Sequence, residues 1–268
     1  MALLRVDGPF DLALTTARFR AFGVDRANVW HEGGLHRAVA GCEVRIEAAP
    51  GGVDVEPLDD ETAPVVRRLL GLDFELEPFY AWAARVTELA ALPGRFRGFR
   101  PALVPDPFEA LVVSITAQQV SLASATAIRS RLIERFGARA GLAWAFPAQE
   151  RLAAASEDEL VAIGFSRRKA EYVVGLARSD LDLGALAALP DEEVKARLVA
   201  VRGLGEWTAD WFLARHLGRP YAWPAGDLAL RRAVAALYGE SDVRAAGVRF
   251  APFQNLTAHY LLAQYLTP

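Results

Sequence analysis

A single carboxylate, Asp227, stands in the segment "PAGDLALRRA", sixteen residues after Trp211. It follows the turn "VRGLGEWT", in which Gly203 and Gly205 flank one leucine. A carboxylate beside aromatic side chains can stabilise a positive charge that develops during a reaction, or orient a water molecule. Glycines between two helices permit positive φ and leave the N–H groups of the next helix start open to an anion. These residues therefore suggest a phosphate-bearing ligand held beside a reactive carboxylate.

Each of these features also has a purely structural interpretation. Asp227 can be the N-cap of the helix that begins at "LALRRAVAAL". The glycine pair can simply close a turn between two helices. Trp207 and Trp211 are four residues apart on one helix face, a spacing that core aromatics share with pocket aromatics. The residue types alone leave both interpretations open.

The elements that must position these residues differ between the two parts of the chain. Up to about residue 57 the pattern alternates in twos, as in "CEVRIEA", and the turn signals "HEGG" and "APGG" separate the predicted strands. From "APVVRRLLGL" onward the period is helical. We therefore expect an α+β protein, with a small antiparallel β-rich domain over 1–92 and a mostly helical domain over 93–268.

Helix starts are well marked in the second part. Asp106 can cap a helix with Pro107 at its first position, and Ser156 with Glu159 has the spacing of a capping box. Further helices are predicted over 121–136, 167–179, 191–200, 206–217, 228–238 and 253–266.

Composition excludes several classes of protein. The single cysteine, Cys42, rules out a disulfide framework and a four-thiolate iron–sulfur cluster. The N-terminus lacks a leader pattern, and no run approaches the roughly 18 apolar residues of a membrane span. We expect a soluble, cytoplasmic protein without a membrane partner. Residues 1–92 carry a net charge of −6 and residues 93–268 one of +3, so a polyanion is expected to meet the second part.

Taken together, the helical segments resemble the helix-hairpin-helix (HhH-GPD) DNA glycosylase superfamily, and within it the bacterial 3-methyladenine DNA glycosylase II type. Gly203, Leu204, Gly205 and Asp227 match the hairpin pattern and its downstream aspartate. The segments "DPFEALVVSITAQQVSLASATAIRSRL" and "IGFSRRKAEYVVGLA" are similar to two earlier segments of the family, in the same order. The resemblance covers residue 93 to the end.

This resemblance implies a monofunctional glycosylase of base excision repair. The enzyme would turn an alkylated, cationic purine out of duplex DNA and hydrolyse its N-glycosidic bond, leaving an abasic site. Asp227 would be the catalytic residue, because a carboxylate near the sugar stabilises an oxocarbenium-like transition state. Bifunctional members attack with a lysine at the position where this chain has Trp207. The alternatives are an oxidised-base glycosylase with lyase activity and a non-catalytic reader of damaged DNA.

The resemblance also implies binding roles. Trp207 and Trp211 would form the base pocket and attract a cationic base through their ring faces. Gln119 would be the plug that replaces the expelled base, with Gln118 supporting it, although two polar residues can simply end a helix. The residues implied to contact DNA are Gln118, Gln119, Arg167, Arg168, Lys169, Gly203, Leu204, Gly205 and Thr208. The charged run from 167 to 169 can also be explained without DNA, as a helix start exposed to solvent.

Cofactor and partner expectations follow from the same resemblance. No organic cofactor and no iron–sulfur cluster are expected, but a monovalent cation is implied on the backbone carbonyls of Val199, Val201 and Leu204. The expected partner is double-stranded DNA with damaged bases, bound by a monomer. The chain departs from the family near its end, where "FAPFQNLTAHYLL" replaces a tryptophan-rich segment followed by Arg-Ser. We expect one pocket wall and the range of lesions to differ accordingly.

Overall fold

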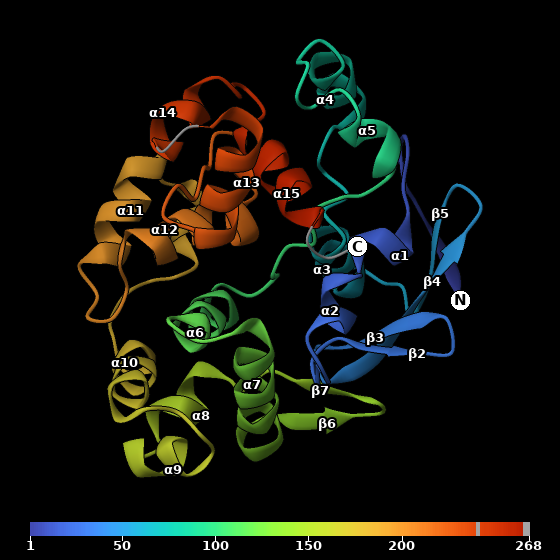
Figure 1. The fold of residues 1–268 in the computed structure, drawn as a ribbon. Coiled ribbons are helices and arrows are strands. Elements are labelled where there is room, and N and C mark those ends of the chain that lie inside the picture. The colour runs from blue at the N-terminus through green and yellow to red at the C-terminus, as the bar shows by residue number, and fades with distance from the viewer. Residues whose placement is uncertain (240–241, 265–268) are drawn as a thin grey trace.

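The N-terminal third of the chain folds into an antiparallel sheet in the computed structural model, which describes residues 1–239 and 242–264 (Figure 1). The strand order is β1-β5-β4-β3-β2. The strands are β1 (Ala2–Arg5), β2 (Val29–His31), β3 (Gly34–Val39), β4 (Cys42–Ala49) and β5 (Gly52–Glu56). In β4 the alternation predicted from "CEVRIEA" holds, since Val44 and Ile46 are fully buried. The predicted turn "HEGG" joins β2 to β3, with Gly33 at φ +81°.

Helices make up most of the remainder, which confirms the predicted α+β class. The helices before residue 100 are α1 (Leu12–Thr15), α2 (Arg18–Ala21), α3 (Thr62–Leu69), α4 (Leu76–Ala83) and α5 (Leu92–Arg95). The middle of the chain holds α6 (Pro107–Ala117), α7 (Leu122–Phe136), the hairpin β6 (Ala138–Ala140) with β7 (Ala143–Ala145), α8 (Gln149–Ala153), α9 (Glu157–Ala162) and α10 (Arg167–Ala177). The last part holds a 3₁₀ turn (Ala185–Ala188), α11 (Asp191–Val199), α12 (Glu206–Phe212), a π-helical turn (Leu213–Leu217), α13 (Leu228–Tyr238), α14 (Val243–Val248) and α15 (Gln254–Ala263).

Three apolar clusters hold these elements together. One covers a face of the sheet with α3 and includes Ile46 and Leu70. A second joins α4 and α5 to α13 and α15 and includes Phe79 and Tyr260. The third lies among α6, α10 and α12. The predicted boundary between 92 and 93 lies inside the second cluster, so the segment of α4 and α5 packs with the C-terminal helices rather than with the sheet.

A buried ion pair fixes the sheet against the helices. Arg37 of β3 donates to Glu109 of α6 at 2.5 Å and to the side chain of Asn28 at 2.9 Å. The start of α6 is in turn capped by Asp106, as predicted, which accepts from the Glu109 N–H at 2.7 Å. Because both charged groups are buried, each depends on the other for a partner. The pair therefore sets where the N-terminal elements sit over α6.

Several local features were not predicted. The short helices α1 and α2 and the β6–β7 hairpin carry no strong periodic signal, and the helix expected over 206–217 changes to a π-helical turn at Leu213. The helix expected over 253–266 runs from Gln254 to Ala263, and residues 265 and 266 lie outside the described part. None of the helices in the described part is long and apolar enough to cross a membrane.

Candidate active site

Asp227 caps a helix with one carboxylate oxygen and contacts two tryptophans with the other. As the N-cap of α13, its Oδ1 accepts the backbone N–H groups of Ala229 and Leu230, each at 3.0 Å. Its Oδ2 faces the other way and accepts the indole N–H of Trp211 at 3.2 Å and that of Trp207 at 3.4 Å. The carboxylate is therefore held in one orientation by four N–H donors.

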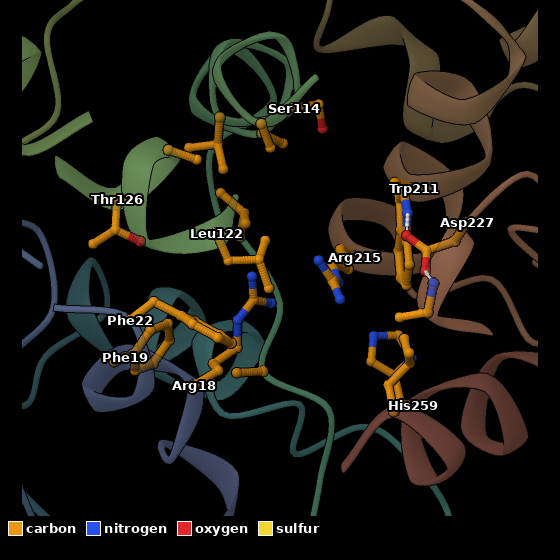
Figure 2. Close-up of a pocket in the computed structure, with 18 of the residues that line it drawn as sticks. Arg18, Phe19, Phe22, Ser114, Leu122, Thr126, Trp211, Arg215, Asp227 and His259 are labelled. Atoms are coloured by element: carbon orange, nitrogen blue, oxygen red, sulfur yellow. Dashed lines mark hydrogen bonds between the residues drawn. The ribbon is translucent and has the colours of Figure 1, made fainter. Parts of the chain in front are cut away.

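A cavity of about 340 Å³ opens beside this carboxylate. Its wall includes Asp227, Trp207 and Trp211 from the hairpin region, together with residues of the N-terminal helices (Figure 2). Figure 2 shows Trp211, Arg215, Asp227 and His259 along one side, with Arg18, Phe19 and Phe22 across from them. The lining residues thus come from α1 and α2 on one side and from α12, α13 and α15 on the other, and α6 and α7 also contribute to the wall.

Arg215 occupies one face of Trp211. Its guanidinium carbon lies 3.7 Å from the ring centroid, and its burial lowers its pKa to about 10, an effect that the charge of Asp227 opposes. Arg215 stands on the π-helical turn, and the periodicity of the sequence did not single it out. The ring face that was expected to attract a cationic base is therefore covered by a cation of the chain, Arg215. The indole N–H of Trp211 is directed to the carboxylate of Asp227.

His259 of α15 belongs to the same wall and lies below Trp211 in the view of Figure 2. Its ring packs edge-on to Trp211, with centroids 5.7 Å apart. Nδ1 lies 3.0 Å from the carbonyl oxygen of Asn255, so Nδ1 carries the proton of the neutral ring. Burial lowers the pKa of His259 to about 3, and the positive charge of Arg215 adds to this effect. The ring is therefore neutral near pH 7 and presents no cation to a base in the cavity.

The C-terminal segment that departs from the family pattern supplies this wall. Phe250 and Phe253 do not line the cavity: Phe250 packs against Trp223 with tilted rings, and Phe253 packs against Phe79. Asn255 donates through Nδ2 to the carbonyl oxygens of Ala214 and Arg219, at 3.1 and 2.9 Å. The segment therefore contributes packing at its start and pocket residues only from His259 onward.

The hairpin between α11 and α12 has the geometry that the glycines predict. Gly203 has φ +97°, and a Cβ there would overlap the ring of Tyr172. Leu204 is buried and anchors the turn. Gly205 is the N-cap of α12, and no neighbouring atom lies within 4 Å of the place a Cβ would take. The start of α12 is therefore open at Gly205, where a phosphate could approach its N–H groups.

The loop after α6 is tied to this hairpin. Gln118 donates through Nε2 to the carbonyl of Gly203 at 2.9 Å and to the hydroxyl of Thr208 at 3.4 Å. Gln119 is exposed and has φ +54°, a conformation that non-glycine residues seldom adopt. Its neighbours Val120 and Leu122 are also exposed, at 40% and 51%. The loop after α6 and the start of α7 thus expose one polar and two apolar side chains, residue types that DNA-binding proteins can insert between bases.

Two residues predicted to contact DNA make side-chain hydrogen bonds within the protein. Thr208 is 1% exposed, so its hydroxyl serves Gln118 and only its backbone N–H is left for a phosphate. Lys169 donates its Nζ to the carbonyl of Thr116 at 2.9 Å, near the end of α6, and burial lowers its pKa. Arg167 and Arg168 are exposed at the start of α10, where Arg167 pairs with Asp158 at 2.6 Å.

The carbonyls predicted to hold a monovalent cation lie at the end of α11 and in the turn that follows. The oxygen of Val201 accepts the N–H of Leu204 at 3.0 Å. Carbonyl oxygens suit a hard cation, so the donor type at Val199, Val201 and Leu204 fits, and the cation itself stays a prediction. Within residues 1–239 and 242–264, no group of three or more His, Cys, Asp or Glu side chains could hold a metal ion.

Sequence reasoning missed most of the cavity wall. Arg215 could have been found, because it stands four residues after Trp211 on the same face. Arg18, Phe19, Phe22 and His259 had no signal that separates them from ordinary surface or core residues.

Substitution of Trp211 tests whether the indole hydrogen bonds to Asp227 affect the reaction rate. Changing Trp211 to Phe removes the N–H that Oδ2 of Asp227 accepts at 3.2 Å while keeping an aromatic ring. Because hydrogen bonds to charged groups are worth about 1.5–3 kcal/mol, we expect the rate of any reaction at this carboxylate to fall at least about tenfold. Trp207→Phe, which removes the longer 3.4 Å contact, is the matched variant and should cost less. Equal losses in single-turnover assays would contradict a specific role for Trp211.

Comparison with known proteins places this site in a family. Residues 112–250 match the family described as HhH-GPD superfamily base excision DNA repair protein. The chain is 32% identical over 187 residues to the DNA-3-methyladenine glycosylase of Bacillus subtilis, a match that covers 66% of this chain and 61% of that protein. The matched region thus spans less than two thirds of that relative's length.

Solved structures agree with this assignment. A 3-methyladenine DNA-glycosylase from Archaeoglobus fulgidus superposes with a TM-score of 0.87 at 28% identity, covering 97% of each chain. A Schizosaccharomyces pombe 3-methyladenine DNA glycosylase in complex with abasic DNA gives a TM-score of 0.58 at 25% identity, over 67% of this chain and 91% of that one. With more than half of its length matched by the family model, the chain belongs to the HhH-GPD superfamily of base excision DNA repair proteins.

Proposed function

We propose that this protein is a monofunctional DNA glycosylase that hydrolyses the N-glycosidic bond of alkylated purines in duplex DNA. The observation that carries the proposal is the fixed carboxylate of Asp227 at the wall of a base-sized cavity, next to a hairpin open to phosphate. The relatives described above are named 3-methyladenine DNA glycosylases, and one of them was solved with abasic DNA, which supports the substrate and partner.

The chemistry follows from what Asp227 can and cannot do. When the bond between base and deoxyribose breaks, positive charge builds on the sugar, and a carboxylate held rigidly beside it lowers the energy of that state. Since four N–H donors already fix Asp227, little reorganisation accompanies the reaction. A purine made cationic by alkylation departs without a separate acid. One carboxylate is then sufficient for water to replace the base.

The positions of the lysines support hydrolysis rather than a lyase reaction. The position of the family's attacking lysine is Trp207, whose indole contacts Asp227. Lys169 is bound to the end of α6. Lys195 pairs with the buried Asp210 at 3.0 Å. Neither amine lines the cavity, so none is placed to form a Schiff base with the sugar.

The proposal predicts one product and excludes another. Incubation with methylated duplex DNA should release modified purines and leave alkali-labile abasic sites. Addition of borohydride during the reaction should trap no covalent protein–DNA complex, because trapping requires a Schiff base. A trapped complex would support the lyase alternative. Binding to damaged duplex without any base release would support the non-catalytic reader.

A further inference from the structure

An arginine of the N-terminal helices projects into the cavity without a partner. Arg18, the first residue of α2, lines the cavity and points into it (Figure 2). The described residues offer its guanidinium no hydrogen bond and no ion pair, and its nearest ring contact is Phe19 at 6.0 Å. Most partly buried arginines in this chain, such as Arg37 and Arg129, do have an acidic partner.

The surroundings of Arg18 make this lack of a partner costly. Burial holds the pKa of Arg18 well below its ordinary value, and the positive charges of Arg215 and Arg129 lower it further. The carboxylate of Asp25, which acts in the opposite direction, is bound by Arg129 at 2.5 Å and by two backbone N–H groups. Asp227 is held by its own four donors. A desolvated cation without an acceptor is unfavourable, so the acceptor is expected to come from a ligand.

The chemistry of the ligand narrows what that acceptor can be. Under the proposed function the cavity receives a base turned out of the duplex. Purines differ at position 6, where guanine derivatives carry a keto oxygen and adenine derivatives carry an amino group. A guanidinium has five N–H donors and no acceptor, so it can bind the keto oxygen but not the amino group.

We propose that Arg18 is a specificity-determining residue that donates to the 6-keto oxygen of the flipped base and so favours alkylated guanine over alkylated adenine. This inference rests on the proposed function and deepens it. It also gives the N-terminal sheet and its helices a task, because they hold Arg18 opposite Asp227.

The test uses one substrate that contains both bases. Duplex DNA treated with a methylating agent contains 7-methylguanine and 3-methyladenine, and both are cationic, so a change of charge in the cavity affects them alike. Their position 6 differs. Arg18→Met should lower the single-turnover rate of 7-methylguanine release about 10- to 100-fold relative to that of 3-methyladenine, the range expected for a lost hydrogen bond from a charged group. Arg20→Met, on the same helix but exposed, is the control and should leave the ratio unchanged.

A second measurement separates this role from a structural one. Because Arg18 has no partner among the described residues, Arg18→Met should raise the free energy of unfolding. In a chain of this size the melting temperature should then rise by about 2–4 °C for each kcal/mol gained. A lower melting temperature would mean that Arg18 stabilises the fold, and the assignment would fail.

The remaining outcomes are distinguishable. Equal changes in both release rates would show that Arg18 acts through charge or a phosphate, which overturns the assignment but leaves the glycosylase intact. Preferential release of 3-methyladenine by the wild-type protein would also overturn it. If the wild-type protein releases neither base, the proposed function itself fails.

Discussion

Asp227→Asn is expected to lower the single-turnover rate of base release from methylated duplex DNA by about 10³-fold or more. Under the proposed function, the substitution removes the negative charge that would face the sugar. It also places an NH₂ group against N–H donors, because each carboxylate oxygen accepts two of them. An amide can satisfy only one of these two pairs, so the loss of charge and a local repulsion act together.

Folding and DNA binding should survive this change. Asn is as good an N-cap as Asp, so α13 keeps its first-turn hydrogen bonds and the variant should fold, with a melting temperature lowered only by the lost indole hydrogen bonds. The hairpin at Gly203 and Gly205 is untouched, and fluorescence anisotropy should give a similar Kd for damaged duplex. Base release near the wild-type rate by the folded variant would remove Asp227 from the mechanism.

Gly203→Ala is expected to lower the free energy of unfolding by about 2–4 kcal/mol. The residue has φ +97°, where a side chain is strained, and the added Cβ would overlap the ring of Tyr172. Gln118, which donates to the Gly203 carbonyl, would lose its anchor as the turn shifts. Urea unfolding measures the stability loss, and weaker binding to duplex DNA should accompany it.

Gly205→Ala in the same turn is the matched control. Gly205 has φ −113°, and its Cβ would enter open space, so the free energy of unfolding should change by less than about 1 kcal/mol. If the start of α12 seats a phosphate, the new methyl group stands in that space and weakens DNA binding severalfold. Wild-type affinity in the Gly205 variant would place the phosphate elsewhere. Wild-type stability in the Gly203 variant would contradict the packing argument for Tyr172.

The local features of the site could be predicted because they depend on short stretches of chain. The capping role of Asp227, the turn at Gly203 and Gly205 and the shared face of Trp207 and Trp211 all follow from spacings within one or two helical turns. Local geometry alone decides such features, so residue type and order are enough.

The orientation of other side chains could not be predicted. Thr208 and Lys169 were expected at the DNA surface, but packing turned them toward α6 and its loop. The change to a π-helical turn at Leu213 altered the surface that follows Trp211, and periodicity gives no sign of such a change. In each case the partner lies in a distant segment, so no short window of sequence contains the information.

By itself the sequence determined the fold class, the helix starts, the hairpin and the single carboxylate, because backbone preferences and apolar periodicity act over a few residues. Only the tertiary structure decided that Arg18 from the N-terminal helices and His259 from the last helix share one cavity with Asp227. The arrangement of these three residues around one cavity depends on the buried Arg37–Glu109 pair and on apolar clusters that join segments far apart in the chain. Burial of such surfaces is favourable only when the whole chain has folded, so the composition of the cavity is a property of the packing and not of any one motif.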